Sequence, residues 1–259
     1  MPNISGPAPT LATTITGSGP AVVLAHGAGG GIDANFGALI PLLAEHHTVI
    51  GSDYPGDDTP LDIDSLADAL VEAAVAAGAA EFTMIGYSLG TAVAVRAAAR
   101  HPDRVRRLVL TAGFARVDNR ARANLELWQR LLAAGDRASF ARVTLLSGFG
   151  ADFVNAIPAE RLPGLLEQMA ATVPGGTAAQ AALAATVDVT ADLPRVTVPT
   201  LVIGLAGDLL VDPANARAQA AAIPGARYLE LPGGHVVMAE QPEPWHAAVL
   251  DFLPELTSR

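Results

Sequence analysis

The sequence contains no cysteine and no lysine. Its 259 residues include 16 basic side chains, and every one of them is arginine. Without cysteine the chain cannot form a disulfide, a thiolate nucleophile or a thiolate metal site, and without lysine it cannot form a Schiff base or a lysine-dependent phosphate loop. Any chemistry must therefore use oxygen and nitrogen groups. We expect neither a cofactor nor a bound metal.

Charged and aromatic residues are also scarce, at 16% and 5% of the chain, whereas 51% is hydrophobic. An apolar share this high indicates a folded protein, because disordered chains keep their apolar content low. The net charge of −10 is spread along the chain without a basic stripe, which disfavours nucleic acid and anionic membranes as partners. We therefore expect a small-molecule substrate, and the oligomeric state stays open.

Long apolar runs are missing as well. Residues Met1 to Pro9 contain no basic run followed by an apolar stretch, and no 18 consecutive residues are apolar and uncharged. These absences predict a soluble, cytoplasmic protein.

Short β-branched runs alternate with alanine-rich stretches along most of the chain, a pattern typical of βαβ units with a mostly parallel sheet. Most of the runs are uninterruptedly apolar, which indicates strands covered by helices on both faces. The turn residues Gly17–Pro20 predict a hairpin between the first two strands. The expected strands are Leu11–Thr16, Ala21–Ala25, Thr48–Ser52, Phe82–Ile85, Val105–Leu110, Thr200–Ile203 and Arg227–Leu231. The expected helices between them are Ala34–Glu45, Ser65–Ala77, Leu89–Arg100, Asn215–Ala222 and Pro244–Leu256.

The alternation stops between Ala115 and Leu193. This stretch contains no convincing strand, and glycines and prolines divide it into helix-like pieces. It therefore reads as a helical insertion, residues 115–193, in a core formed by residues 1–114 and 194–259. The expected helices of the insertion are Arg120–Ala134, Arg137–Leu146 and Leu162–Ala171.

The pentapeptide Gly86–Gly90 reads Gly-Tyr-Ser-Leu-Gly and matches the G-x-S-x-G pattern. It lies between an expected strand and an expected helix, which is the context in which this pattern forms a tight turn. Small residues two positions before and after the serine let the backbones pass, and the turn exposes the serine hydroxyl. Ser88 is therefore the candidate nucleophile.

A serine hydroxyl needs a neighbouring base, and the base needs an acid to orient it. His235 is the candidate base, because it follows Pro232–Gly234 at the carboxyl end of an expected strand, where open α/β sheets build their sites. The other five histidines are better placed for structural roles: His26 opens a glycine-rich loop, and His46, His47, His101 and His246 lie in or at the ends of helices.

Two aspartates compete for the role of the acid. Asp208 ends a strand and turn at a carboxyl edge, whereas Asp212 precedes Pro213 and a helical run and so fits a helix N-cap. No carboxylate follows the earlier strand in Ala112–Phe114. We therefore favour Asp208.

Attack on a carbonyl develops an oxyanion, which needs preorganised donors. The backbone N–H of Leu89, directly after the nucleophile, is one candidate. The backbone N–H of Ala28 is the other, because it lies in the glycine-rich loop His26–Gly31 after a strand. This loop lacks the G-x-G-x-x-G pattern of a nucleotide-binding turn.

In chain order, Ser88, Asp208 and His235 resemble the α/β-hydrolase superfamily, in its serine esterase, lactonase and cofactor-free haloperoxidase-like branch. Asp53–Gly56 resembles the D-x-P-G stretch of these proteins, and Pro199–Asp208 resembles the segment that carries their acid. The resemblance implies an α/β-hydrolase fold: a mostly parallel sheet of about eight strands, flanked by helices, with residues 115–193 as a helical cap over the active site.

The resemblance has two departures. Asp57 and Asp58 follow the D-x-P-G stretch where most relatives continue with G-x-G-x-S, which predicts a reshaped, more acidic loop. A serine at the nucleophile position also argues against the epoxide-hydrolase and dehalogenase branches, which attack through a carboxylate.

The expected activity is hydrolysis of an ester, lactone or thioester of a small, largely apolar molecule through an acyl-enzyme intermediate. The alternatives use the same residues for C–C bond hydrolysis, lyase, acyl-transfer or perhydrolysis chemistry, or keep the fold as a non-catalytic receptor for a small ligand. Several apolar residues are candidates for lining the substrate pocket, and the same residues also fit simple packing in the core. They are Tyr87, Phe114, Trp128, Phe140, Phe149, Phe153, Met169 and Val236.

Overall fold

Seven strands form one sheet in the computed structural model, which describes residues 11–253. Their order is β1-β3-β2-β4-β5-β6-β7, and every neighbouring pair is parallel except β1 and β3. The sheet confirms the predicted fold class, with a strand number close to the expected eight. The strands are β1 (Ala12–Thr16), β2 (Ala21–Ala25), β3 (Thr48–Asp53), β4 (Phe82–Tyr87), β5 (Val105–Thr111), β6 (Thr200–Leu205) and β7 (Arg227–Leu231).

The turn at Gly17–Pro20 does not close a hairpin, so that prediction is wrong. Strand β3 lies between β1 and β2, antiparallel to the first and parallel to the second. The turn crosses the start of β3: the Thr48 N–H donates to the Pro20 carbonyl (3.1 Å), and a Cβ on Gly19 would collide with the His46 carbonyl oxygen. A local turn signal carries no information about a later strand that enters between its two arms.

Helices cover both faces of the sheet and create two buried cores. One core contains Leu66, Leu70 and Val93 of α3 and α4, and the other contains Phe36 of α1 and Trp245 of α12. Strands β4 and β6 are buried along their whole length as a result. The helices outside the long insertion are α1 (Ile32–Phe36), α2 (Ile40–Ala44), α3 (Ile63–Ala76), α4 (Leu89–Arg100), α10 (Pro213–Ala222), α11 (Val237–Glu240) and α12 (Pro242–Phe252).

Most predicted helices agree with the structure to within two residues at each end, and two differ by more. The single helix expected over 34–45 is two short helices, because the chain leaves the first after Phe36 and Pro41 sits in the first turn of the second, where its missing N–H costs no hydrogen bond. The last helix ends at Phe252, and the end predicted for it at Leu256 lies outside the described residues, as do Met1 to Pro9.

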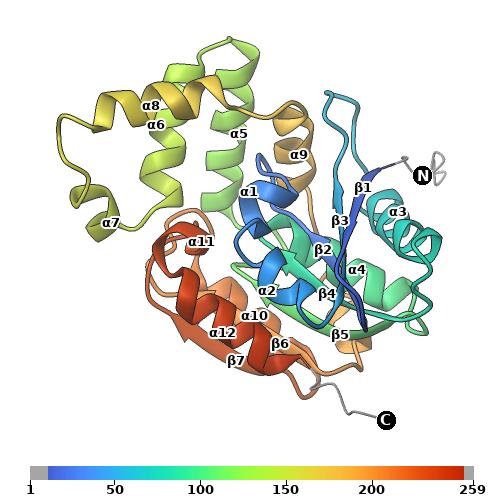
Figure 1. Cartoon of the computed structure of the whole chain (residues 1–259). Helices are drawn as coiled ribbons and strands as arrows, with labels where there is room; N and C mark the ends of the chain where they lie inside the picture. Colours follow the sequence, from blue (N-terminus) through green and yellow to red (C-terminus); the bar gives the residue numbers. More distant parts are fainter. Residues whose placement is uncertain (1–10, 254–259) are drawn as a thin grey trace.

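A helical segment separates β5 from β6. Figure 1 shows α5, α6, α7 and α8 together on one side of the sheet, with α9 beside α5. The sequence does not predict helices α7 and α9: α7 has only five residues, too few to show a helical period, and the alanine-rich α9 gives little periodic contrast. The division into a core and a cap of residues 115–193 stays a prediction. The segment comprises α5 (Asn119–Ala133), α6 (Arg137–Gly148), α7 (Ala151–Asn155), α8 (Leu162–Ala171), α9 (Thr177–Ala184) and the 3-10 turn η1 (Leu193–Arg195).

Across residues 11–253, none of the helices has the combined length and hydropathy that a membrane crossing requires.

Candidate active site

Ser88 occupies the sharp corner between β4 and α4. Its backbone has φ 52° and ψ −120°, a conformation that non-glycine residues rarely adopt. The Ser88 N–H donates to the Thr111 carbonyl (2.9 Å), and the Thr91 hydroxyl donates to the Ser88 carbonyl (2.7 Å). A Cβ on Gly86 would lie 2.5 Å from the Gly90 carbonyl oxygen, and a Cβ on Gly90 would collide with the Ala25 carbonyl of β2, so both glycines of the motif are required for the close packing of α4 on the strands.

Ser88, His235 and Asp208 form one hydrogen-bonded chain. The Ser88 Oγ lies 2.9 Å from His235 Nε2, and His235 Nδ1 lies 2.6 Å from Asp208 Oδ2. Because an ionised carboxylate only accepts, Nδ1–H donates to Asp208, and Nε2 of a neutral imidazole is left to accept the serine proton. All three side chains are buried. The arrangement can therefore take a proton from a serine hydroxyl away from bulk water.

The two competing aspartates have separate surroundings. Asp208 follows β6, and its Oδ1 accepts the N–H groups of Leu210 (2.9 Å) and Val211 (2.8 Å), which leaves Oδ2 for His235. Asp212 caps α10 by accepting the Ala214 N–H (2.8 Å). The structure thus places the favoured aspartate beside His235, and the other one at a helix N-terminus.

The loop that carries His235 is held from two sides. The Tyr87 hydroxyl donates to the His235 carbonyl (2.8 Å), and burial together with the charges of Asp208 and Glu240 raises the pKa of Tyr87. The Glu240 carboxylate accepts the N–H groups of Gly234 (2.9 Å) and Gly150 (3.1 Å). Glu240 therefore joins the histidine loop to the turn between α6 and α7.

The two proposed oxyanion donors lie beside Ser88. Neither the Ala28 nor the Leu89 N–H has a hydrogen-bond acceptor among residues 11–253. The neighbouring amides of the glycine-rich loop do have acceptors: the Gly27 N–H donates to Asn35 Oδ1 and the Gly29 N–H to Gln180 Oε1, each at 2.9 Å. The two groups predicted to bind an oxyanion are therefore left available for one.

His26 has a structural position at the start of this loop. Its Nε2 accepts the Tyr54 N–H (3.0 Å), its Nδ1 lies 2.8 Å from the Gly27 carbonyl, and its ring stacks on Tyr54. Burial is the main effect on this imidazole and lowers its pKa. A neutral His26 then donates from Nδ1 to Gly27 and accepts at Nε2, which is the pattern observed.

The cavity at Ser88 is very small, about 20 Å³, which is enough for about one water molecule. Two of the predicted pocket residues, Phe114 and Trp128, line it. Phe140 packs edge-on against Trp128 instead, with ring centroids 5.3 Å apart. The cavity is otherwise apolar, apart from Ser88 itself. Its remaining lining residues are Ala28, Ala121, Leu125, Ala184, Leu210 and Val211.

Other predicted pocket residues lie elsewhere. Phe149, Phe153 and Met169 line a separate cavity of about 800 Å³ among α6, α7 and α8. Tyr87 lies beneath His235, with the two rings 5.2 Å apart, and the Val236 N–H donates to the Gly148 carbonyl (2.9 Å). These five residues do not line the cavity at Ser88, because the docking of the helices, which spacing in sequence does not encode, decides which of them face it.

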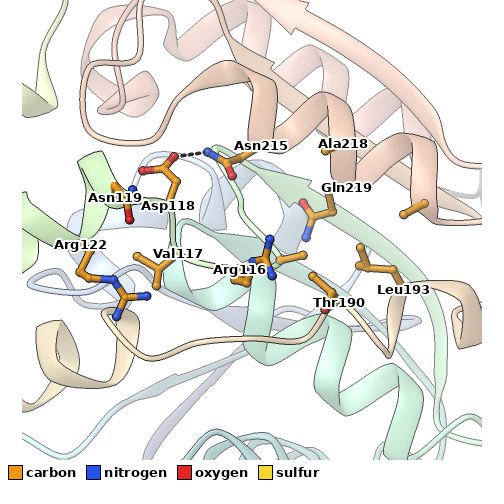
Figure 2. A pocket seen from close by; sticks show the side chains of 12 residues that line it. Arg116, Val117, Asp118, Asn119, Arg122, Thr190, Leu193, Asn215, Ala218 and Gln219 are labelled. Carbon is orange, nitrogen blue, oxygen red and sulfur yellow. Dashed lines mark hydrogen bonds between the residues drawn. The ribbon is translucent and has the colours of Figure 1, made fainter.

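A third cavity, of about 710 Å³, lies between the start of α5 and helix α10. Figure 2 shows Asp118 and Asn215 joined by a hydrogen bond (2.7 Å) on one side of it, with Arg116 and Thr190 on another. Ser88 and His235 do not line it. Asp57 and Asp58 border a fourth cavity, of about 450 Å³, together with Arg137.

Within residues 11–253, no three histidine, aspartate or glutamate side chains are grouped as a metal site would require.

A family model described as the alpha/beta hydrolase fold matches residues 20–242, and the chain belongs to this family. Over 247 residues the chain is 36% identical to pyrrolizixenacetamide deacetylase of Xenorhabdus hominickii, with 92% of each chain covered. Two solved structures are similar: the enol-lactonase of Burkholderia xenovorans LB400 (26% identity, TM-score 0.82, covering 95% of this chain and 96% of that one) and a thermophilic esterase of Thermogutta terrifontis (25% identity, TM-score 0.80, covering 93% and 92%).

Sequence reasoning missed two polar residues at the site, Gln180 and Glu240. Both accept backbone N–H groups of loops that carry predicted site residues. Gln180 is 151 positions from its partner Gly29, and Glu240 is 6 positions from Gly234 and 90 from Gly150. No local motif marks either residue. The only available signal is their residue type, a polar side chain in an otherwise alanine-rich or apolar helix.

Proposed function

We propose that the protein is a serine hydrolase that removes a small acyl group from an ester or amide through an acyl-enzyme intermediate. The observation that carries the proposal is the unbroken hydrogen-bonded chain from Ser88 through His235 to Asp208, next to two backbone N–H groups that have no acceptor within residues 11–253. The names of the similar proteins, a deacetylase, an enol-lactonase and an esterase, support acyl transfer to water as the chemistry.

Each group has a defined role in the reaction. His235 Nε2 takes the proton of the Ser88 hydroxyl as the oxygen attacks the carbonyl carbon, and Asp208 stabilises the resulting imidazolium. The negative oxygen of the tetrahedral intermediate accepts hydrogen bonds from the Ala28 and Leu89 N–H groups. His235 then returns the proton to the departing alcohol or amine. Water, deprotonated by His235, attacks the acyl-enzyme and releases the carboxylic acid.

The size of the Ser88 cavity supports a small acyl group. A volume of about 20 Å³ has no space for a long acyl chain unless the surrounding helices move. Apolar side chains such as Phe114 and Leu125 form its walls, and they favour a methyl-sized group over a charged one. The methyl of an acetyl group is apolar and about the size of one water molecule, so it meets both requirements, and the name of the deacetylase relative is consistent with that choice.

The proposal is tested by labelling and by rate. A fluorophosphonate probe should modify Ser88, and peptide mass spectrometry locates the label. Ser88→Ala should abolish the labelling and lower kcat toward p-nitrophenyl acetate by at least about 1000-fold. Ser147→Ala is the matched control, because Ser147 is equally buried, at 8% exposed, but donates only to the Val143 carbonyl. A folded wild-type protein that takes no label and turns over no substrate would contradict the proposal.

The substrate class is tested in the same assay. We expect p-nitrophenyl acetate to react faster than the butyrate and octanoate esters, and p-nitroacetanilide to report amide cleavage. Adding hydrogen peroxide measures perhydrolysis through the peracid formed. An octanoate ester that reacts as fast as the acetate would contradict a small acyl group while leaving the serine mechanism intact.

A further inference from the structure

Gln180 connects the helical segment to the loop that carries Ala28. It lies on α9, is only 2% exposed, and its Oε1 accepts the Gly29 N–H at 2.9 Å, across 151 residues of sequence. Thr177 and Ala184 extend the same face of α9, at spacings of three and four residues. Ala184 lines the Ser88 cavity, and the Thr177 methyl lies 3.2 Å from where a Cβ of Gly29 would be. This face of α9 therefore packs directly on the Ser88 side of the sheet.

The position of Ala28 is fixed by the two peptide groups that flank it. In the peptide before Ala28, the Gly27 carbonyl accepts from His26 Nδ1 (2.8 Å). The N–H of the same planar trans peptide, which belongs to Ala28, points in the opposite direction. In the peptide after Ala28, the Gly29 N–H is held by Gln180. One anchor is local in sequence and the other comes from the helical segment.

The second anchor matters because the residue after Ala28 is a glycine. Gly29 has φ +71°, a region that glycine occupies freely, so its own backbone preference holds the loop weakly. The Gly29 N–H bond to Gln180 is the hydrogen bond that restrains this peptide in the described part of the chain. Without it, this turn is closed only by the long hydrogen bond from the Gly30 N–H to the Gly27 carbonyl (3.4 Å) among the described residues, so rotation about Gly29 becomes easier and shifts the Ala28 N–H.

We propose that Gln180 is a positioning residue that aims the Ala28 N–H at the oxyanion formed at Ser88. This inference rests on the function proposed above. An oxyanion donor contributes only when it already points at the developing charge, so a loss of aim lowers kcat rather than substrate affinity. Helix α9 then has two effects at once: it closes one wall of the cavity through Ala184 and completes the oxyanion site through Gln180.

A purely structural role for Gln180 makes a different prediction. A buried amide that only fills space and satisfies one N–H would affect the free energy of unfolding, and kcat of the folded enzyme would stay unchanged. Gln219 offers a matched comparison. It is also a fully buried glutamine on a helix, and neither of its amide atoms has a hydrogen-bond partner within residues 11–253.

The experiment compares Gln180→Met, Gln180→Asn and Gln219→Met with the wild type. Methionine keeps the volume without an acceptor, and asparagine keeps the amide but is shorter by one methylene, so neither can hold Gly29 as glutamine does. With p-nitrophenyl acetate we expect both Gln180 variants to lose about 10- to 100-fold in kcat, with KM within about threefold. Gln219→Met should keep the wild-type kcat.

A transition-state analogue distinguishes a change in the orientation of the Ala28 N–H from a change in the stability of the fold. Methylboronic acid forms a tetrahedral adduct with the serine, and its inhibition constant should rise in the Gln180 variants by about the factor by which kcat/KM falls. Thermal unfolding of each variant is recorded alongside, and Gln180→Asn serves if Gln180→Met does not fold. A Gln180 variant with kcat within twofold of the wild type, or an equal loss in Gln219→Met, would overturn the inference.

Failure of this inference is distinguishable from failure of the proposed function. If wild-type protein is neither labelled at Ser88 nor active, the function itself is wrong. If the wild type is labelled and active and the Gln180 variants are too, only the positioning role is wrong.

Discussion

Two of the cavities lined by the helical segment contrast in volume and in polar lining: the smaller one has the proposed reactive groups and the larger one has the space. The cavity at Ser88 holds about 20 Å³ and adjoins a serine hydroxyl that contacts an imidazole, beside two backbone N–H groups without acceptors among residues 11–253. The cavity among α6, α7 and α8 holds about 800 Å³. Glu160, Arg161 and Gln168 are the polar side chains at the larger one, and they are not joined to one another by hydrogen bonds within residues 11–253. Convergent hydrogen-bonding groups, rather than volume, distinguish the proposed active site.

The difference follows from how each cavity is built. The carboxyl ends of β4, β6 and β7 meet at one edge of the sheet, and the loops after them bring Ser88, Asp208 and His235 together. The larger cavity is enclosed by short helices that pack through apolar side chains such as Phe149 and Phe153, whose rings stack 5.1 Å apart. The geometry of the sheet fixes the arrangement of Ser88, Asp208 and His235, whereas side-chain packing between helices determines the shape of the larger cavity.

The largest expected effect comes from the acid at the sheet edge. Asp208→Asn should lower kcat toward p-nitrophenyl acetate by about 1000- to 10,000-fold, because an amide favours the wrong tautomer of His235. Asp212→Asn is the matched control: asparagine also caps helices, so α10 and activity should both be retained. Steady-state kinetics of the two purified variants test this. Similar losses in both would break the contrast between the triad and the helix cap.

An intermediate effect is expected from widening the small cavity. Leu125→Ala removes buried carbon atoms from its wall, so the ratio of butyrate to acetate hydrolysis should rise about 10-fold, the discrimination that one or two methylene groups provide. Phe153→Ala widens the larger cavity and should leave this ratio unchanged. Competition between the two esters measures the ratio directly. A change caused by Phe153→Ala would show that the larger cavity also holds the acyl chain.

The smallest expected effect concerns the stability of the loop at Ser88. Burial lowers the pKa of His26, so the unfolded chain binds a proton at this histidine more readily than the folded protein does. The free energy of unfolding should therefore fall as pH drops below about 6.5, by up to about 1.4 kcal/mol per pH unit from this group. Urea unfolding at pH 7, 6 and 5 gives the free energy of unfolding at each pH, and this free energy should fall less steeply with decreasing pH in His26→Asn than in the wild type. Equal slopes would contradict the assignment of a neutral, buried imidazole.

The comparison also shows what a sequence can predict. The proximity of Ser88, Asp208 and His235 could be predicted because each lies in a local motif at the end of a strand, and the parallel sheet brings those ends together. Their catalytic roles stay predictions. The fold class followed from the alternation of elements. The position of β3 between β1 and β2, and the contact of Gln180 with Gly29, depend on docking over tens to hundreds of residues, for which the chain has no local signal.

The predicted pocket residues stay a prediction, and the structure divides them between separate cavities for the same physical reason. An aromatic residue in a helical insertion is driven to an interior by its apolar surface, and several interiors meet that requirement equally well. Trp128 and Phe114 reach the Ser88 cavity, whereas Phe149 and Phe153 pack on each other in the larger one. Hydrophobicity specifies that these side chains are buried, and helix docking specifies where.

The backbone of Ser88 has one more consequence, for the selection of improved variants. At φ 52° and ψ −120° a glycine would relieve about 1 to 3 kcal/mol of conformational cost. A library of variants ranked only by thermal stability would therefore enrich glycine at position 88, and with it proteins that have lost the proposed nucleophile. At this position, selection for thermal stability and selection for catalytic turnover therefore favour different residues.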